Sequence, residues 1–195
     1  MSYNQEFFDE YKVYLQEPQV RKAHDTMFRI FGDTFPKWKY PFNVIDFGCG
    51  QCCEYASYGQ PSGYAGIDMD PPPGVFKGDY TKLTGQEINR FGNPRAFVSL
   101  FSTECCLHPV DKYAFYRRVF RETEIEMALV AGFYYRNKVK EEKVEETGGI
   151  VSYQTVEAQQ DYICPEFIEY RTYINVPSKM FGSDVVEVWK TLIRK

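Results

Sequence analysis

Residues 43–50 are Asn43-Val44-Ile45-Asp46-Phe47-Gly48-Cys49-Gly50, an apolar run that ends in an acid and then turns through Gly-x-Gly. The apolar run predicts a buried strand, and the glycines after it permit a positive φ and let a ligand approach the backbone closely. In open α/β sheets, nucleotide-like ligands bind at the carboxyl ends of the strands. We therefore expect this turn to lie under such a ligand, with the Asp46 carboxylate either accepting hydrogen bonds from a ligand amine or holding its own loop.

A second acid occupies the corresponding place on the next predicted strand, residues 64–68. This strand ends in Gly66-Ile67-Asp68, and an acid at this place can accept hydrogen bonds from both ribose hydroxyls of a nucleoside. Met69 adds apolar surface that can contact a base. Asp70 competes for this role, although it lies beyond the strand and precedes Pro71. Asp68 is the preferred ribose ligand because Gly66-Ile67 before it keeps the strand open to a ligand.

A third acid, Asp79, follows a weak strand-like segment at residues 75–78. Its carboxylate, or the backbone of Tyr80, is placed to receive the exocyclic amine of adenine. An aspartate after Gly78 is equally typical of a turn that it stabilises itself. The sequence leaves both roles open.

Helices and strands alternate along most of the chain, which is typical of βαβ units and a parallel sheet. Residues 3–34 have apolar side chains at helical spacing and a break at Pro18, so two helices are expected to cover the site. The charged run 136–146 is expected to be a solvated helix or loop. Strands are expected at 42–47, 64–68, 75–78, 96–101, 127–134, 150–156, 167–174 and 185–193, the last two as an antiparallel hairpin at the sheet edge, with further helices at 51–58, 84–91 and from 109 onward.

Composition and charge limit the class of protein. The chain has 195 residues, of which 44% are apolar and 17% aromatic, enough for one domain with a sizeable core. The formal net charge of -4 comes without a basic stripe, so a nucleic-acid partner is disfavoured. The first residues lack the basic start and apolar run of a signal peptide, and no stretch reaches the ~18 apolar residues of a membrane span. We therefore expect a cytoplasmic protein with no membrane contact.

Six cysteines stand at positions 49, 52, 53, 105, 106 and 164. In a cytosolic protein they are expected to be reduced thiols. Their spacing does not match a zinc site and the chain has only two histidines, so no metal is expected. Small buried residues near strand ends and a thiol cluster near the ligand site both fit this pattern.

Together, residues 44–50 and Gly66-Ile67-Asp68 resemble the first two motifs of the class I S-adenosylmethionine-dependent methyltransferases. The resemblance covers roughly residues 40–135. It implies a Rossmann-like α/β fold, a three-layer sandwich around a mostly parallel seven-stranded sheet with an antiparallel C-terminal strand and an N-terminal helical cover. It also implies S-adenosyl-L-methionine as the cofactor. The implied cofactor-binding residues are Asp46, Phe47, Gly48, Cys49, Gly50, Asp68, Met69, Asp79, Tyr80 and Ser102.

We expect residues 1–195 to form a single methyltransferase-like domain with three parts. Residues 1–40 would be the helical cover, 41–135 the cofactor-binding core, and 136–195 a substrate-side insertion with the terminal strands. The first motif of the family usually continues to a third glycine, where this chain has Gln51-Cys52. A non-catalytic module of the same fold that binds S-adenosylmethionine or a nucleoside is therefore the alternative to an enzyme.

Methyl transfer from a sulfonium requires alignment and a dry site rather than a protein nucleophile. The segment after the fourth strand, residues 101–108, is expected to face the transferred methyl group. In it, Glu104 and His108 are the candidate catalytic residues, as a base or as groups that orient a polar acceptor. The alternative, without a catalytic role, is that Glu104 is an ordinary loop acid and that His108 is a residue at the start of the helix that begins at Pro109.

The acceptor is inferred from what this segment lacks. It has no Asn/Asp-Pro-Pro-aromatic motif, which the family uses for amino groups on bases or amides. A small-molecule acceptor is therefore favoured, and a protein or RNA acceptor bound through residues 136–183 is the remaining alternative.

Overall fold

The computed structural model describes residues 5–33, 43–50, 63–135, 142–144, 151–155, 164–174 and 185–195. Two helices come first, α1 (Gln5–Gln16) and α2 (Pro18–Asp33). The alternating region contains β1 (Val44–Phe47), β2 (Tyr64–Asp68), β3 (Phe76–Lys77), the 3-10 helix η1 (Tyr80–Lys82), α4 (Gly85–Asn89), β4 (Ala96–Leu100), α5 (Thr103–Cys106), α6 (Pro109–Glu122) and β5 (Met127–Tyr135). The remaining strands are β6 (Glu142–Val144), β7 (Val151–Thr155), β8 (Phe167–Ile174) and β9 (Val185–Arg194).

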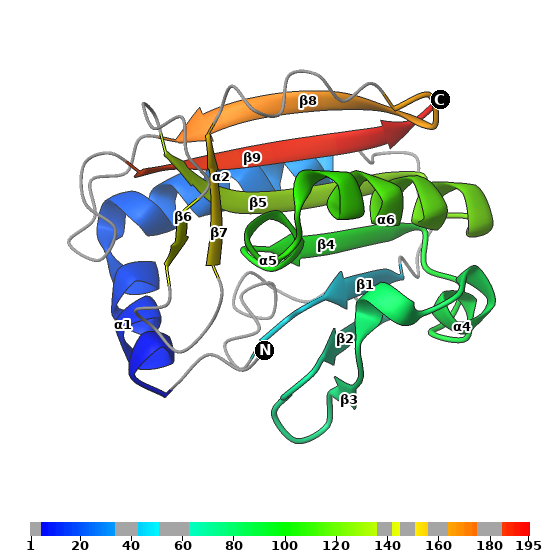
Figure 1. Ribbon diagram of the computed structural model, residues 1–195, viewed down its shortest axis with the longest axis horizontal. Coiled ribbons are helices and arrows are strands. Elements are labelled where there is room, and N and C mark those ends of the chain that lie inside the picture. Colours follow the sequence, from blue (N-terminus) through cyan, green and yellow to red (C-terminus); the bar gives the residue numbers. More distant parts are fainter. Residues whose placement is uncertain are drawn as a thin grey trace.

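The strands form one mixed sheet, shown in Figure 1. Among the described residues, seven strands lie side by side in the order β3-β2-β1-β4-β5-β9-β8. The first five are parallel, whereas β9 is antiparallel to both β5 and β8. β7 pairs in parallel with the end of β5, and β6 pairs antiparallel with β7. The predicted sheet is confirmed, including its antiparallel C-terminal strand and the β8–β9 pairing at its edge.

The strand register brings the motif residues to one edge of the sheet. Asp46 of β1 pairs with Gly66 of β2 on one side and with Val98 of β4 on the other. Because these strands are parallel, their carboxyl ends meet at the same edge, which is where the turn after β1 opens (Figure 1). This is the edge at which open α/β sheets bind ligands.

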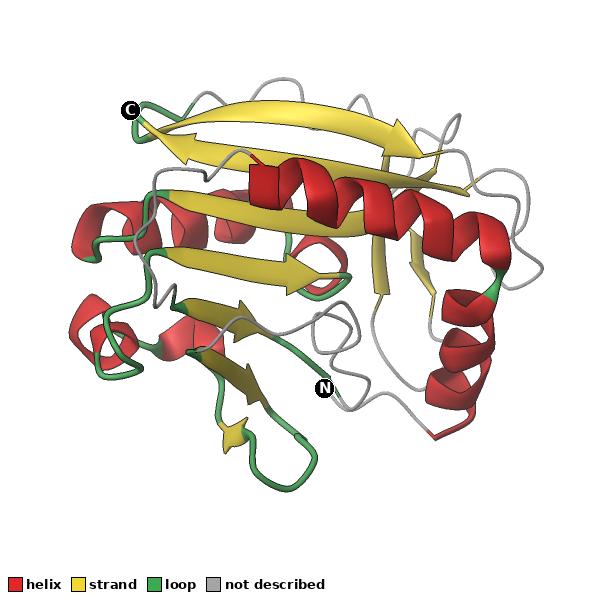
Figure 2. Ribbon diagram, turned by 180° about the vertical axis from the view of Figure 1, so that it is seen from behind, coloured by secondary structure: helices red, strands yellow, loops and turns green. Residues whose placement is uncertain are grey.

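Helices cover both faces of the sheet. In Figure 2, α2 crosses one face with α1 turned down beside it, and α6 lies behind the strands on the other face. On the face of α2, Met27 and Trp189 belong to one buried core. On the face of α6, Phe115 and Phe97 belong to a second. The predicted three-layer arrangement and the N-terminal helical cover are therefore confirmed.

Local sequence explains where the two long helices begin. Pro18 is the first residue of α2, where its fixed φ suits the helix and its missing N–H leaves no donor unpaired. α6 begins at Pro109 in the same way, after an N-cap at His108. Its apolar side chains then recur at helical spacing and form a stripe against the sheet. The buried residues of this stripe include Tyr113, Phe115, Tyr116, Val119 and Phe120.

The structure differs from the sequence prediction in a few elements. Glu142–Val144 form strand β6, although the charged run around them suggested a solvated helix or loop, because this backbone finds hydrogen-bonding partners on β7. The third strand is only Phe76–Lys77 long. The short helix α5 interrupts a segment for which no helix was expected. The helix expected at residues 51–58 lies outside the described residues.

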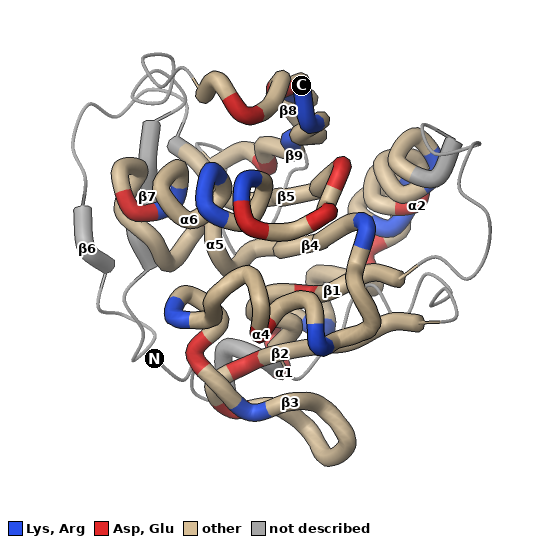
Figure 3. Tube along the Cα trace, turned by 90° about the vertical axis from the view of Figure 1, so that its right-hand side faces the viewer, with Lys and Arg blue, Asp and Glu red and all other residues tan. Residues whose placement is uncertain are grey.

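Acidic and basic residues are mixed on the side of the molecule seen in Figure 3. There, Lys and Arg positions alternate with Asp and Glu positions on and around α6. The described residues on this side therefore form no continuous basic stripe of the kind that a polyanion binds. Within the part of the chain that the structure describes, no helix combines the length and the apolarity that crossing a membrane requires.

Candidate functional site

The turn after β1 depends on glycine at two positions. Gly48 and Gly50 have φ values of +70° and +60°, in the left-handed region that side chains rarely adopt. The Gly48 N–H donates to the carbonyl of Ile67 at 2.8 Å, which ties the turn to β2. A Cβ on Gly48 would overlap the side chain of Ser102 and lie 3.0 Å from Cε1 of Tyr80. The turn is therefore packed between the end of β2 and the loop after β4.

Asp68 joins the two motif turns. Its Oδ2 accepts the Gly50 N–H at 2.9 Å, and its Oδ1 accepts the Asp70 N–H at 2.9 Å. A carboxylate has about four lone-pair sites, so these two bonds leave room for ligand hydroxyls. The acid that the sequence predicts for ribose thus lies directly beside the glycine turn, with Met69 next to it and 45% exposed.

The other predicted residues of β1 and of the turn after it divide between the candidate site and the core. Asp46 is 3% exposed and accepts a hydrogen bond from the Tyr64 hydroxyl at 2.7 Å. Phe47 is completely buried, with its ring 5.2 Å from that of Phe115. It points into the core on the face of α6, so it can contribute to a ligand site through its backbone only. Cys49 is buried, and its N–H donates to the Ile67 carbonyl at 3.3 Å.

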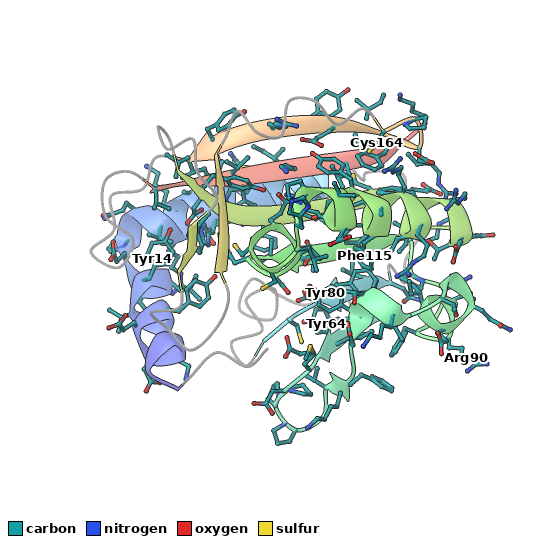
Figure 4. The ribbon with its side chains drawn as sticks, viewed as in Figure 1. Tyr14, Tyr64, Tyr80, Arg90, Phe115 and Cys164 are labelled. Atoms are coloured by element: carbon teal, nitrogen blue, oxygen red, sulfur yellow. The ribbon has the colours of Figure 1, made fainter. Side chains whose placement is uncertain are left out.

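Tyr80 and Ser102 meet beside the glycine turn. Their hydroxyl oxygens are 2.9 Å apart, within hydrogen-bond distance. Burial raises the pKa of Tyr80 far above its ordinary value, so its hydroxyl stays neutral. Figure 4 labels Tyr80, the first residue of η1, and Tyr64, the first residue of β2. Tyr80 and Ser102, which come from different segments of the chain, thus both lie against the glycine turn after β1.

Asp79 has the contacts of a turn aspartate. Its Oδ1 accepts the Thr81 N–H at 3.1 Å and the Thr81 hydroxyl at 2.6 Å, and its Oδ2 lies 3.0 Å from Nζ of Lys82. Partial burial acts to raise the pKa of Asp79, but the hydrogen bonds from Thr81 and Lys82 outweigh it and lower the pKa. The side chain therefore caps η1, and its role toward adenine stays a prediction.

The loop after β4 has an unusual backbone. Phe101 has a φ of +57°, which is rare for a residue with a bulky side chain, and the Phe101 N–H donates to the Ala131 carbonyl at 2.7 Å. The Phe101 ring stacks on that of Phe133 at 4.4 Å between centroids. Strained backbone of this kind is often found at functional sites. The kink turns Phe101 toward the core under the helical cover, while the next residue, Ser102, contacts the glycine turn.

Glu104 is completely buried in a cluster of charged and hydroxyl groups. Its Oε2 lies 3.1 Å from Nζ of Lys112 and 2.6 Å from Nζ of Lys190, and it also accepts the Tyr134 hydroxyl. Its Oε1 accepts the Tyr116 hydroxyl at 2.7 Å. Burial acts to raise the pKa of Glu104, but the two lysines outweigh it and hold the pKa well below its usual range.

This environment does not favour Glu104 as a base. An ionised carboxylate with a low pKa and no exposure neither takes up a proton readily nor meets an acceptor. The cluster was missed from the sequence, although Lys190 gives a signal because it interrupts the apolar strand β9. Glu104 is therefore better described as the centre of a buried charge cluster beneath the loop after β4.

His108 occupies the helix-entry position. It is exposed, and its Nδ1 accepts the Val110 N–H at 3.4 Å as the N-cap of α6. The structure thus shows the capping role, and a catalytic role for His108 stays a prediction.

A second buried polar cluster, which the sequence did not predict, lies on the face of α2. Glu187 of β9 is 2% exposed and accepts the Trp189 Nε1–H at 2.8 Å. It also accepts the Tyr14 hydroxyl and lies 2.9 Å from Nε2 of His24. The two helices of the cover are thus joined to the sheet by one carboxylate.

Three of the four described cysteines, Cys49, Cys105 and Cys164, are buried, and Cys106 is partly buried. Cys105 is buried, and burial raises its pKa far above the ordinary value of a thiol. Burial likewise raises the pKa of Cys164 to about 11. Both thiols stay protonated at neutral pH and are poor nucleophiles. Among the described ranges, no three His, Cys, Asp or Glu side chains are grouped so that they could hold a metal ion.

Comparison with known proteins identifies the fold. No family model and no curated protein sequence match the chain. The 1,6-didemethyltoxoflavin-N1-methyltransferase of Burkholderia thailandensis, solved with 1,6-didemethyltoxoflavin and S-adenosylhomocysteine, has a TM-score of 0.62 and 14% identity over 96% of this chain and 83% of that chain. The N-methyltransferase NodS of Bradyrhizobium japonicum, solved with S-adenosylhomocysteine, has a TM-score of 0.60 and 10% identity over 93% and 90%.

A third neighbour carries a different activity on the same fold. The [4+2]-cyclase SpnF has a TM-score of 0.61 and 10% identity over 91% of this chain and 84% of that chain. At such identities the comparison establishes the architecture: this chain has the fold of the class I S-adenosylmethionine-dependent methyltransferases. Because one fold serves several reactions, activity must be argued from the site.

Proposed function

We propose that this protein is an S-adenosylmethionine-dependent methyltransferase that acts on a small-molecule acceptor. The observation that carries the proposal is the 2.9 Å hydrogen bond from the Gly50 N–H to Asp68. It joins the glycine turn after β1 to the acid after β2, the two features from which the sequence predicts a nucleoside ligand. Solved neighbours of the same fold contain S-adenosylmethionine or S-adenosylhomocysteine, which supports this choice of ligand.

Each motif residue has a part in holding the cofactor. Asp68 would accept hydrogen bonds from the ribose hydroxyls, and the exposed side chain of Met69 would contact the base. Asp46 and the turn at Gly48 and Gly50 would hold the amino-acid end. The cofactor supplies an activated methyl group, so the remaining work of the protein is alignment and exclusion of water.

The residues after β4 would form the wall of the transfer position. Ser102 is fixed between the glycine turn and Tyr80. Phe101 and Phe133 stack on each other at the carboxyl ends of β4 and β5, in the core beneath the helical cover, and this packing would keep water out from behind the transfer position. The small-molecule acceptor is proposed because residues 101–108 have no Asn/Asp-Pro-Pro-aromatic motif. Glu104 would support this loop through its buried cluster, and no protein base is assigned.

A non-catalytic binding module is the second candidate. The Gln51-Cys52 pair stands where the methyltransferase motif has a further glycine, and the cyclase SpnF has the same fold with another activity. Such a module would bind the same cofactor through Asp68 and the glycine turn but would transfer no methyl group.

Calorimetric titration of the protein with S-adenosylmethionine and S-adenosylhomocysteine tests the proposal. We expect both to bind with micromolar affinity, and methylated products to form from a panel of small hydroxyl, amine and heterocyclic acceptors. A folded protein that binds neither ligand contradicts the proposal. Binding without any methylated product from the panel favours the binding module.

A further inference from the structure

The side chain of Tyr64 reaches Asp46 from the neighbouring strand. The Tyr64 hydroxyl donates to Oδ2 of Asp46 at 2.7 Å. In the parallel register, Tyr64 pairs with Val44, whereas Asp46 pairs with Gly66. Tyr64 and Gly66 lie on the same face of β2, since side chains alternate along a strand. The tyrosine ring therefore extends along β2, past Gly66, toward the carboxyl edge of the sheet where the acid lies.

Gly66 keeps the path of this ring open. A Cβ at Gly66 would lie 3.3 Å from the Tyr64 hydroxyl oxygen and 2.8 Å from Sγ of Cys49. The first distance is tighter than most contacts of a real Cβ, and the second cannot be accommodated without a shift. Any side chain here would press on both the tyrosine and the glycine turn. At this position glycine is thus required for space.

The hydrogen bond has consequences for Asp46 because this acid is only 3% exposed. A buried carboxylate needs hydrogen-bond donors, and each donor also fixes the plane of the carboxylate. The donor from Tyr64 comes from the side of β2 and occupies Oδ2. Replacing the hydroxyl by hydrogen would remove this constraint while leaving the ring in place.

We propose that Tyr64 is a positioning residue of the cofactor site, which orients the Asp46 carboxylate toward the ammonium group of the amino-acid end of the cofactor. This inference rests on the proposed function. In this role Tyr64 acts through Asp46 and not on the reacting atoms, so its effect should be confined to ligands that carry the amino-acid end.

The test compares two ligands on the variant Tyr64→Phe. S-adenosylhomocysteine carries the amino-acid end, whereas 5′-methylthioadenosine has the same nucleoside and thioether without it. We expect Tyr64→Phe to lower the affinity for S-adenosylhomocysteine roughly tenfold or more, as is typical for loss of a hydrogen bond to a charged group. The affinity for 5′-methylthioadenosine should stay within about twofold of the wild-type value. Calorimetric titration measures both affinities.

The matched control is Tyr113→Phe. It removes another tyrosine hydroxyl that donates to a carboxylate, Oε2 of Glu169, at 2.8 Å, but on α6 and β8. We expect it to change neither affinity. Adding Tyr64→Phe to Asp46→Asn should cause less additional loss than Tyr64→Phe causes alone, since the two residues act through one contact.

The outcomes separate this inference from the function on which it rests. Unchanged affinity for S-adenosylhomocysteine in Tyr64→Phe, or equal weakening of both ligands, overturns the positioning role while leaving the proposed function intact. Failure of the wild-type protein to bind either ligand overturns both. If Tyr64→Phe does not fold, Asp46→Asn must show the loss confined to S-adenosylhomocysteine, and equal weakening of both ligands by that variant overturns the inference.

Discussion

Nε2 of His24 on α2 lies 2.9 Å from Oε2 of Glu187 on β9, and both side chains are almost completely buried. The two residues are 163 positions apart in the sequence. The His24 ring also packs 4.9 Å from that of Trp189, whose Nε1–H donates to the same carboxylate. This contact fixes the N-terminal helical cover on the sheet at the edge where the candidate site lies.

Replacing Glu187 by Gln should therefore destabilise the protein. The amide retains one acceptor oxygen but turns an N–H group toward the donors of His24, Trp189 and Tyr14, and leaving buried donors unpaired is unfavourable. We expect the free energy of unfolding to fall by about 2–4 kcal/mol. Urea unfolding followed by circular dichroism measures it.

An exposed glutamate provides the control for this prediction. Glu124 is 73% exposed and lies 2.7 Å from Arg95. Exposed ion pairs contribute little, so Glu124→Gln should lower the free energy of unfolding by less than about 1 kcal/mol. Equal effects of the two substitutions would contradict a special role for the His24–Glu187 contact.

The buried cluster at Glu104 predicts a pH dependence of stability. Burial lowers the pKa of Lys112 from 10.5 to about 7, although Glu104 opposes this shift. Between pH 7 and 10.5 the Lys112 amine is thus protonated in the unfolded chain, whereas in the folded chain it has lost its proton. The free energy of unfolding then rises with pH across this window, and the contribution of Lys112 is most unfavourable below about pH 7.

Lys112→Met should remove this part of the pH dependence. From about pH 7 to 9, the wild-type protein should gain stability relative to Lys112→Met by roughly 1 kcal/mol per pH unit. Lys12→Met, at an exposed lysine of α1, should instead follow the wild type at every pH. Urea unfolding at several pH values across this range gives the comparison. A difference between wild type and Lys112→Met that stays constant with pH would refute the prediction.

Local patterns were sufficient to predict the elements around the candidate site. The strand at 64–68 has the predicted bounds, and its terminal Asp68 accepts the Gly50 N–H of the glycine turn. Such predictions succeed because a strand, its terminal acid and the following turn are determined by neighbouring residues. The same holds for His108, whose capping role follows from the Pro109 after it.

Contacts between distant elements could not be predicted in this way. Glu104 meets Lys190, which is 86 positions away, only because β9 inserts beside β5 in one particular register. β9 is buried on both faces for most of its length, so its sequence has no alternation that would show which side chains face α6. The sequence suggested a base at Glu104 because the lysines that lower its pKa lie on other elements.

The role of Asp68 is open to a direct test. Asp68→Ala removes the acceptor proposed for the ribose hydroxyls and the acceptor of the Gly50 N–H. It should therefore lower the affinity for S-adenosylhomocysteine more than tenfold. The side chain is only partly buried, so the loss of stability should stay small. Asp70→Ala is the control, since Asp70 is exposed and contacts Asp68 through its backbone. Calorimetric titration that finds equal affinities for wild type and Asp68→Ala would rule out the assigned role.

The glycine turn gives the final prediction, because two glycines of similar φ differ in their surroundings. Gly48 has a φ of +70° and no space for a Cβ beside Ser102, whereas Gly74 has a φ of +89° and no atom within 4 Å of the place that a Cβ would take. Gly74→Ala should lower the free energy of unfolding by only about 1 kcal/mol, because of backbone strain. Gly48→Ala adds a steric overlap to this strain and should lower the free energy of unfolding by about 3 kcal/mol or more.

Binding should separate the two variants further. Gly48→Ala must move either the turn or Ser102, and both belong to the candidate cofactor site, so we expect binding of S-adenosylhomocysteine to be lost even at temperatures where the variant is folded. Gly74→Ala should bind like the wild type. Thermal unfolding with and without S-adenosylhomocysteine tests both points: the ligand should raise the Tm of Gly74→Ala and leave that of Gly48→Ala unchanged. A ligand-induced rise in the Tm of Gly48→Ala equal to that of the wild type would mean that the ligand does not lie on this turn.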